Sequence, residues 1–151
     1  MELRHTIAAR LHLLHRLPCP WGSDAVPDRP YVGAYGELAA ASWLRAQGCR
    51  VLRQGFRWGR SGEIDLVCRE GGTLVFVEVK SGTVDGPYPL AAKVDEEKRA
   101  LLRRGARNWF MLLGHEVPHR FDVVEVHLRA GQRPALARHV NAFPPLVNPM
   151  D

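Results

Sequence analysis

The sequence is poor in cysteine, in lysine and in long apolar runs, and these shortages exclude several classes of protein. Its three cysteines, Cys19, Cys49 and Cys68, are too few and too widely spaced for a disulfide framework or a CxxC metal site. No apolar stretch approaches the roughly 18 residues that a membrane-spanning helix needs. Arginines also interrupt the N-terminal stretch that would otherwise imitate a signal peptide. We therefore expect a soluble, cytoplasmic protein with reduced cysteines and no membrane partner.

The length of 151 residues predicts one folded domain. Residues 1–17 have the spacing of an amphipathic helix rich in basic side chains, and residues 18–30 contain four prolines. We expect a basic helix and a linker over residues 1–30, followed by the folded domain over residues 31–151. An organelle transit peptide, which is also rich in arginine and poor in acidic residues, is a less favoured alternative for the N-terminal segment.

The charge is unevenly distributed around a net value of +5. Residues 1–60 carry nine basic and four acidic side chains, residues 61–90 carry two and five, and residues 91–113 carry six and three. An acidic centre between basic flanks is typical of a surface that binds a polyanion around a group of carboxylates. A solvated, arginine-rich surface with no ligand would give the same totals.

Hydrophobic periodicity predicts the order helix, three strands, helix, strand. The last strand is reached from the third through a long helix, which is the usual connection between parallel neighbours. We therefore expect an α/β fold with a mixed central sheet flanked by helices. The predicted helices cover residues 34–47 and 95–113, and the predicted strands cover residues 51–58, 63–69, 73–80 and 121–128.

The second and third predicted strands form a hairpin around Gly71-Gly72. This loop places Asp65 opposite Glu78, and Glu63 opposite Lys80. Two like charges that face each other on a sheet are destabilising unless something compensates them. Because side chains alternate along a strand, Lys80 shares a face with Glu78, so two carboxylates and an ammonium group converge.

A divalent cation between Asp65 and Glu78 would turn this repulsion into coordination. Ligation by oxygen alone selects hard ions such as Mg²⁺ or Mn²⁺, which activate water and offset charge in phosphodiester hydrolysis. Lys80 would then position the water or stabilise the developing oxyanion. The alternative is a solvated hairpin with a Glu63–Lys80 ion pair. However, the chain contains only three lysines, so a lysine would rarely occur at this position by chance.

Several separated motifs together resemble the YraN-type bacterial family, over about residues 31–143. That family is assigned to the PD-(D/E)XK nuclease superfamily and is similar to archaeal Holliday-junction resolvases. The resemblance implies a restriction-endonuclease-like αβββαβ core with Asp65 and Glu78 as metal ligands, Lys80 as the catalytic lysine, and Glu37 completing the metal site. The motifs are Gly33-x-x-Gly36-Glu37, Gly62-Glu63-Ile64-Asp65-Leu66, Val75-Phe76-Val77-Glu78-Val79-Lys80, a basic helix from Lys98, and Arg120-Phe121-Asp122-Val123-Val124.

The chain departs from the family pattern at a few positions. Ile64 replaces the superfamily proline, which is usual in the Glu-Ile-Asp variant. Gly55 stands where the YraN-type pattern has asparagine, and Ser81-Gly82 replace more polar or basic residues. These departures concern substrate contacts more than the metal site.

A second motif, His115-Glu116-Val117-Pro118-His119, matches the H-E-x-x-H pattern of zinc proteases. That chemistry needs both histidines one turn apart on a helix, and Pro118 is incompatible with such a turn. We expect a loop that enters the last strand.

Basic side chains suited to phosphate contact occur on the second helix and beside Trp58, which is placed to stack on a base or to pack in the core. On the helix a spacing of four residues predicts a single basic stripe, although such a stripe is often only a solvated face. The candidates are Arg57, Arg60, Lys98, Arg99, Arg103 and Arg107.

The sequence thus predicts a Mg²⁺- or Mn²⁺-dependent endonuclease that hydrolyses phosphodiester bonds in DNA, with branched or junction DNA as candidate substrates. Symmetric cutting of two strands would favour a homodimer. Two alternatives remain: a nuclease-fold protein that binds nucleic acid without cutting it, and a module whose basic face docks an acidic protein.

Overall fold

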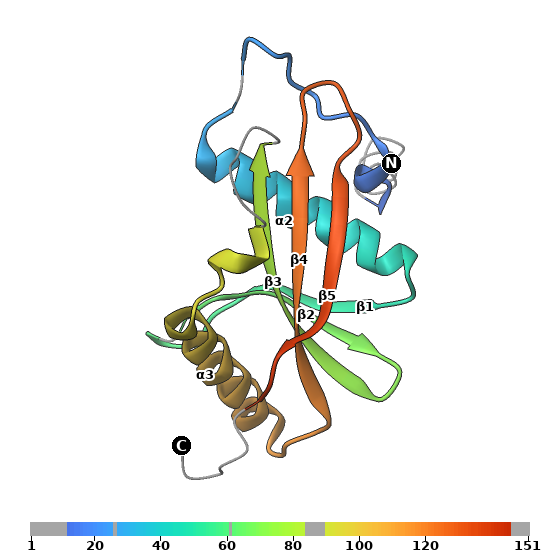
Figure 1. Cartoon of the computed structure of the whole chain (residues 1–151). Coiled ribbons are helices and arrows are strands. Elements are labelled where there is room, and N and C mark those ends of the chain that lie inside the picture. Colours follow the sequence, from blue (N-terminus) through green and yellow to red (C-terminus); the bar gives the residue numbers. More distant parts are fainter. Residues whose placement is uncertain (1–11, 26, 61, 84–89, 146–151) are drawn as a thin grey trace.

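The computed structural model describes residues 12–25, 27–60, 62–83 and 90–145. Within them two α-helices pack against a five-stranded sheet, as Figure 1 shows. The helices are α2 (Arg29–Ala46) and α3 (Glu96–Leu113), with short 3-10 helices η1 (Leu14–Arg16) and η2 (Leu90–Lys93). The strands are β1 (Arg50–Phe56), β2 (Ile64–Glu70), β3 (Thr73–Thr83), β4 (His119–Leu128) and β5 (Ala135–Phe143).

The strand order is β1-β2-β3-β4-β5. All neighbours are antiparallel except β3 and β4, which run parallel and are connected through α3. This confirms the predicted α/β fold with its mixed sheet and parallel crossover. The edge strand β5 is an addition that the sequence pattern does not predict. No helix in the described ranges is long and apolar enough to cross a membrane.

The first long helix begins five residues before its predicted start. The Asp28 side chain accepts a hydrogen bond from the Tyr31 backbone N–H at 3.0 Å, and Pro30 lies in the first turn. A proline is tolerated there because the first backbone N–H groups of a helix have no partner within the helix. The proline that looked like the end of a linker is therefore part of the helix start.

The segment before α2 packs against the domain. Cys19 is 3% exposed and its backbone N–H donates to the Gln132 carbonyl at 2.8 Å. The Trp21 ring meets the Tyr35 ring edge to face, with 5.2 Å between centroids. Most of the helix predicted over residues 1–17 lies outside the described residues, and the described part contains only η1.

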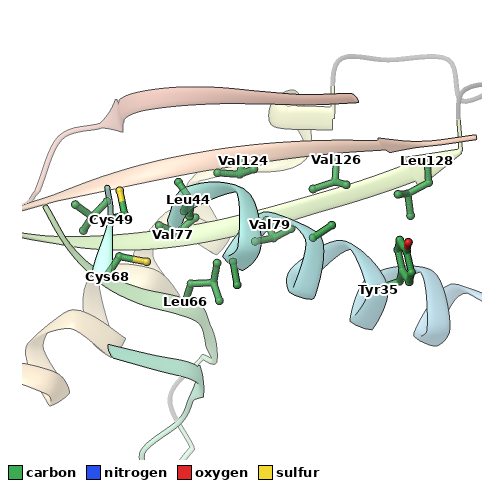
Figure 2. Packing of buried hydrophobic residues seen from close by; sticks show 14 of the residues in the cluster. Tyr35, Leu44, Cys49, Leu66, Cys68, Val77, Val79, Val124, Val126 and Leu128 are labelled. Carbon is green, nitrogen blue, oxygen red and sulfur yellow. The ribbon is translucent and has the colours of Figure 1, made fainter. Parts of the chain in front are cut away.

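Alternation along the strands divides the core between two faces of the sheet. Val77 and Val79 of β3 pack beneath α2, together with Val124 and Val126 of β4 (Figure 2), and Val75 belongs to the same cluster. The intervening positions, such as Phe76 and Phe121, pack on the opposite face with the apolar side of α3. The sheet is therefore the middle of three layers.

Gly36 sets the distance between α2 and the sheet. A Cβ atom at this position would overlap the Ser81 side chain, so a larger residue would force helix and strand apart. Since Glu37 follows directly, this close approach brings its carboxylate to the end of β3. The helix glutamate of the sequence motif is thus placed by the glycine before it.

Candidate functional site

The candidate site lies where β2 separates from β3. Their ladder runs from Glu70 opposite Thr73 to Leu66 opposite Val77, which confirms the predicted hairpin register. One step further along, the Asp65 Oδ2 atom accepts a hydrogen bond from the Val79 backbone N–H at 2.8 Å. A side-chain carboxylate thus binds the backbone of β3 at the point where the two strands diverge.

Glu78 is the most buried acidic side chain of the site, at 4% exposed. Its Oε1 atom lies 3.5 Å from the Nζ of Lys80 and 3.4 Å from the Nζ of Lys98. Its Oε2 atom is buried and has no hydrogen-bond partner among the described residues. A buried, unpartnered carboxylate oxygen is costly in free energy, so this atom marks a position suited to a ligand.

Glu37 of α2 reaches the same place from the other side of the sheet. Burial raises the pKa of Glu37 above its ordinary value, and the neighbouring Asp65 carboxylate raises it further. Burial likewise raises the pKa of Glu78, with Asp65 adding to the effect while Lys98 and Lys80 oppose it. The structure therefore brings together three carboxylates from three elements, as the sequence predicts.

The donor set fits a hard divalent cation. Among the described residues, no group of three or more His, Cys, Asp or Glu side chains is placed to hold a metal ion. Mg²⁺ does not need one, because it keeps several waters and takes one or two protein carboxylates. Asp65 and Glu78 supply these carboxylates on adjacent strands, and the unpartnered Glu78 Oε2 leaves an oxygen available.

All three lysines of the chain surround this site. Lys80 and Lys98 pair with Glu78, and Lys80 and Lys93 line a pocket of about 550 Å³ that Glu37 also borders. The sequence predicts Lys98 as a phosphate contact near the edge of the site, and the structure places its Nζ atom 3.4 Å from the Glu78 Oε1 atom. The sequence motifs do not predict a role for Lys93 or the presence of the pocket. The rarity of lysine, which supports a functional role for Lys80, applies to Lys93 as well.

The remaining phosphate-contact candidates fall into different environments. Arg57 and Arg60 are exposed in the connection between β1 and β2, at the end of the sheet where Asp65 lies. Arg107 is exposed on α3. Arg99 is partly occupied, since its Nε donates to the Val94 carbonyl at 3.2 Å and its guanidinium lies 5.4 Å from the Phe143 ring centroid.

Arg103 does not join an exposed basic stripe. It is 8% exposed, and its guanidinium donates to Glu96 at 2.7 Å and to the Pro144 carbonyl at 3.1 Å. It also lies 5.4 Å from the centre of the Phe143 ring. These contacts hold the end of β5 against α3, so phosphate binding by Arg103 would require breaking them.

The predicted cross-strand pairing of Glu63 with Lys80 is wrong. Strand β2 begins at Ile64, so Glu63 lies before the sheet, and Lys80 pairs with Glu78 instead.

Gly55, where the family pattern has asparagine, has a φ of +68°. Glycine and asparagine are the residues that most readily adopt this left-handed conformation, so the departure at Gly55 has a backbone explanation.

The H-E-x-x-H segment follows the end of α3 and enters β4 at His119. The predicted loop is confirmed, and the two histidines do not share a helix turn.

The class of protein follows from this arrangement. A helix, three antiparallel strands, a crossover helix and a parallel fourth strand, with acidic residues on the second and third strands, define a restriction-endonuclease-like α/β core. A sequence model described as Uncharacterised protein family UPF0102 matches residues 36–126. The chain belongs to this family, which is the YraN-type family that its motifs resemble.

Relatives described as UPF0102 proteins occur in several bacteria. The protein of Pelobacter propionicus is 37% identical over 124 residues, covering 80% of this chain and 88% of the relative. The protein of Symbiobacterium thermophilum is 46% identical over 96 residues, covering 63% of this chain and 80% of the relative. That of Streptomyces coelicolor is 42% identical over 112 residues, covering 71% and 84%.

Among solved structures, SfsA of Pyrococcus furiosus in complex with Ca²⁺ aligns with a TM-score of 0.34 and 16% identity. The alignment covers 74% of this chain and 64% of SfsA.

Proposed function

We propose that the protein is a Mg²⁺- or Mn²⁺-dependent nuclease that hydrolyses phosphodiester bonds in DNA. One observation supports this most strongly: Glu37, Asp65 and Glu78 interact electrostatically where β2 leaves β3, and a Glu78 oxygen there is buried without a hydrogen-bond partner among the described residues. Such crowding of like charges stores unfavourable energy that a bound cation would relieve. Branched and junction DNA are the substrates to test first.

Each side chain has a separate role in this proposal. Asp65 and Glu78 bind the metal, with Glu37 completing the site from α2. The ion, when bound, supplies an activated water and offsets negative charge on the phosphate. Lys80, whose side chain is 27% exposed beside Glu78, donates from Nζ to a phosphate oxygen and stabilises the charge that develops there.

Binding of the nucleic-acid backbone would fall to the cations around this centre. Arg57, Arg60, Lys98, Arg99 and Arg107 are proposed to contact phosphates, while Arg103 keeps its packing role. Such contacts hold the strand in place and carry no sequence information. A homodimer would have two such sites related by a two-fold axis, one for each of the two strands that are cut in a junction.

The proposal is tested with purified protein on linear, flapped and four-way-junction DNA in Mg²⁺, in Mn²⁺ and in chelator. We expect cleavage only with metal, and none for Asp65→Asn. Lys80→Ala should also abolish cleavage while DNA affinity and its salt dependence stay nearly unchanged, since one contact among many is lost. Normal cutting by Lys80→Ala would refute the assignment of this motif.

A paired variant separates binding from chemistry. Replacing Arg57 and Arg60 with alanine should weaken binding and flatten the salt slope by about 0.9 for each lost phosphate contact on duplex DNA. Cleavage at saturating DNA should largely survive. Salt-sensitive binding without cleavage by the unmodified protein would instead favour a non-catalytic nucleic-acid-binding protein, and no binding at all would favour a module that docks an acidic protein.

A further inference from the structure

The pocket beside the carboxylates has mixed chemistry. Its volume of about 550 Å³ falls within the roughly 300–1,000 Å³ range of small-ligand sites. Val32 of α2 and Leu90 of η2 are apolar lining residues. Arg29 and Lys93 are exposed at its edge, and neither has an ion-pair partner among the described residues. Apolar walls with cations at the rim suit a ligand that has a flat apolar part and a negative part.

Gly33 keeps this pocket open. Unlike Gly36, which allows α2 to approach the Ser81 side chain, an added Cβ at Gly33 would meet no atom within 4 Å in the described part of the chain. Glycine weakens a helix interior relative to alanine, and packing gives no reason for it here. Gly33 precedes Glu37 by one turn and lines the pocket with it, so a side chain at this position would project into the space beside the carboxylates.

We propose that this pocket receives one unstacked nucleotide of the substrate, so that the protein acts on nucleic acid that is single-stranded at the site. This inference rests on the proposed function and names its substrate class. The base would pack against Val32 and Leu90, and its phosphate would lie between Lys80 and the rim cations Arg29 and Lys93. A base held in a duplex must first be unpaired and unstacked to enter such a pocket, whereas an unpaired base enters at much lower cost.

The test compares binding of a labelled single-stranded oligothymidylate and a labelled blunt duplex, measured by fluorescence anisotropy in Mg²⁺ with the Asp65→Asn background to prevent cutting. Gly33→Leu fills the pocket, and Ala34→Leu adds the same side chain at the neighbouring exposed position. We expect Gly33→Leu to weaken single-strand binding by about tenfold, with duplex binding unchanged. Ala34→Leu should leave both affinities unchanged.

A second variant keeps the test decisive if Gly33→Leu does not fold. Lys93→Glu changes an exposed side chain at the rim and should weaken single-strand binding more than duplex binding. Equal losses on both probes, or no loss on either, would overturn the pocket assignment.

Cleavage by the protein with native Asp65 distinguishes the two proposals. If the metal-dependent activity disappears in Asp65→Asn but the pocket variants bind both probes normally, the nuclease proposal stands and the pocket inference fails. If no DNA is cut but Gly33→Leu selectively loses single-strand binding, the pocket inference stands as a binding site and the nuclease proposal fails.

Discussion

Two charged groups of this protein differ in how completely their charges are satisfied. The carboxylate cluster consists of Glu37, Asp65 and Glu78 with Lys80 and Lys98. Within the described part of the chain, it leaves the Glu78 Oε2 atom buried without a hydrogen-bond partner. The ion-pair network consists of Glu70 at the hairpin end of β2, Arg120 and Asp122 of β4, and Arg138 of β5. There the Asp122 side chain is fully buried, yet it accepts from Arg120 at 3.0 Å and from Arg138 at 2.9 Å.

The pKa directions of the two groups are opposite. Hydrogen bonds from the Cys49 thiol and from Arg120 lower the pKa of Glu70 to about 2, whereas burial raises the pKa of Glu78. In the network the surroundings favour the charged form, and in the cluster they oppose it. Buried charge that is fully paired stabilises the folded state, whereas incompletely paired buried charge is enriched at functional sites.

We expect the largest effect on stability when the buried Asp122 of the network loses its charge. Asp122→Asn leaves the guanidinium groups of Arg120 and Arg138 without their central countercharge, and we expect the free energy of unfolding to fall by about 3 kcal/mol. Urea denaturation at neutral pH measures this. The exposed Asp24→Asn is the control and should change stability little; an equally small change for Asp122→Asn would show that the network is not structural.

The next effect concerns the close packing that positions Glu37. Gly36→Ala would overlap the Ser81 side chain, and we expect a loss of about 2 kcal/mol in unfolding free energy. Gly33→Ala on the same helix should instead stabilise the protein by up to about 1 kcal/mol. Both are measured by urea denaturation, and similar values for the two variants would contradict the different roles assigned to these glycines.

A smaller effect should appear in acid. In the folded protein the pKa of Glu70 is about 2, below its ordinary value of 4.5. The ionised side chain therefore stabilises the folded state above pH 4.5, and this stabilisation is lost as the pH falls toward 2. Its side chain is 38% exposed, so solvent screening reduces the expected contribution to about 1 kcal/mol. Unfolding free energies measured across this range should fall less steeply for Glu70→Gln, and parallel curves would contradict the assignment.

The smallest effect has the opposite sign and belongs to the carboxylate cluster. Glu78→Gln in chelator removes a buried charge that its surroundings oppose, so we expect stability to stay unchanged or to rise by up to about 1 kcal/mol. Thermal unfolding at pH 8 measures it. A clear fall would mean that the ion pairs with Lys80 and Lys98 are structural, as in the network.

These two groups also differ in how far the sequence could predict them. The hairpin register placed Asp65 against Glu78 because a two-residue loop between alternating strands leaves little freedom. The network depends on Arg138 of β5, a strand that alternation could not reveal because most of its residues are exposed. It also needs Asn141, whose left-handed backbone lets its N–H donate to Asp122 at 2.9 Å.

The same limit applies to the cations. Spacing along α3 predicts the same role for Arg99, Arg103 and Arg107. Arg103 is instead buried by contacts with Glu96 of the same helix and with the Pro144 carbonyl, which follows β5. The position of β5 and the residues after it determines whether Arg103 is exposed, and the spacing of arginines along α3 does not predict that position.

The most direct test of the central claim is the thermal midpoint of the unmodified protein and of Glu78→Gln as Mn²⁺ is added. A cation that binds only the folded state adds about 2.7 kcal/mol at a hundredfold excess over its Kd, which corresponds to several degrees for a protein of this size. We expect that rise for the unmodified protein and none for Glu78→Gln. No rise in either, or the same rise in both, would contradict a metal site at the carboxylate cluster.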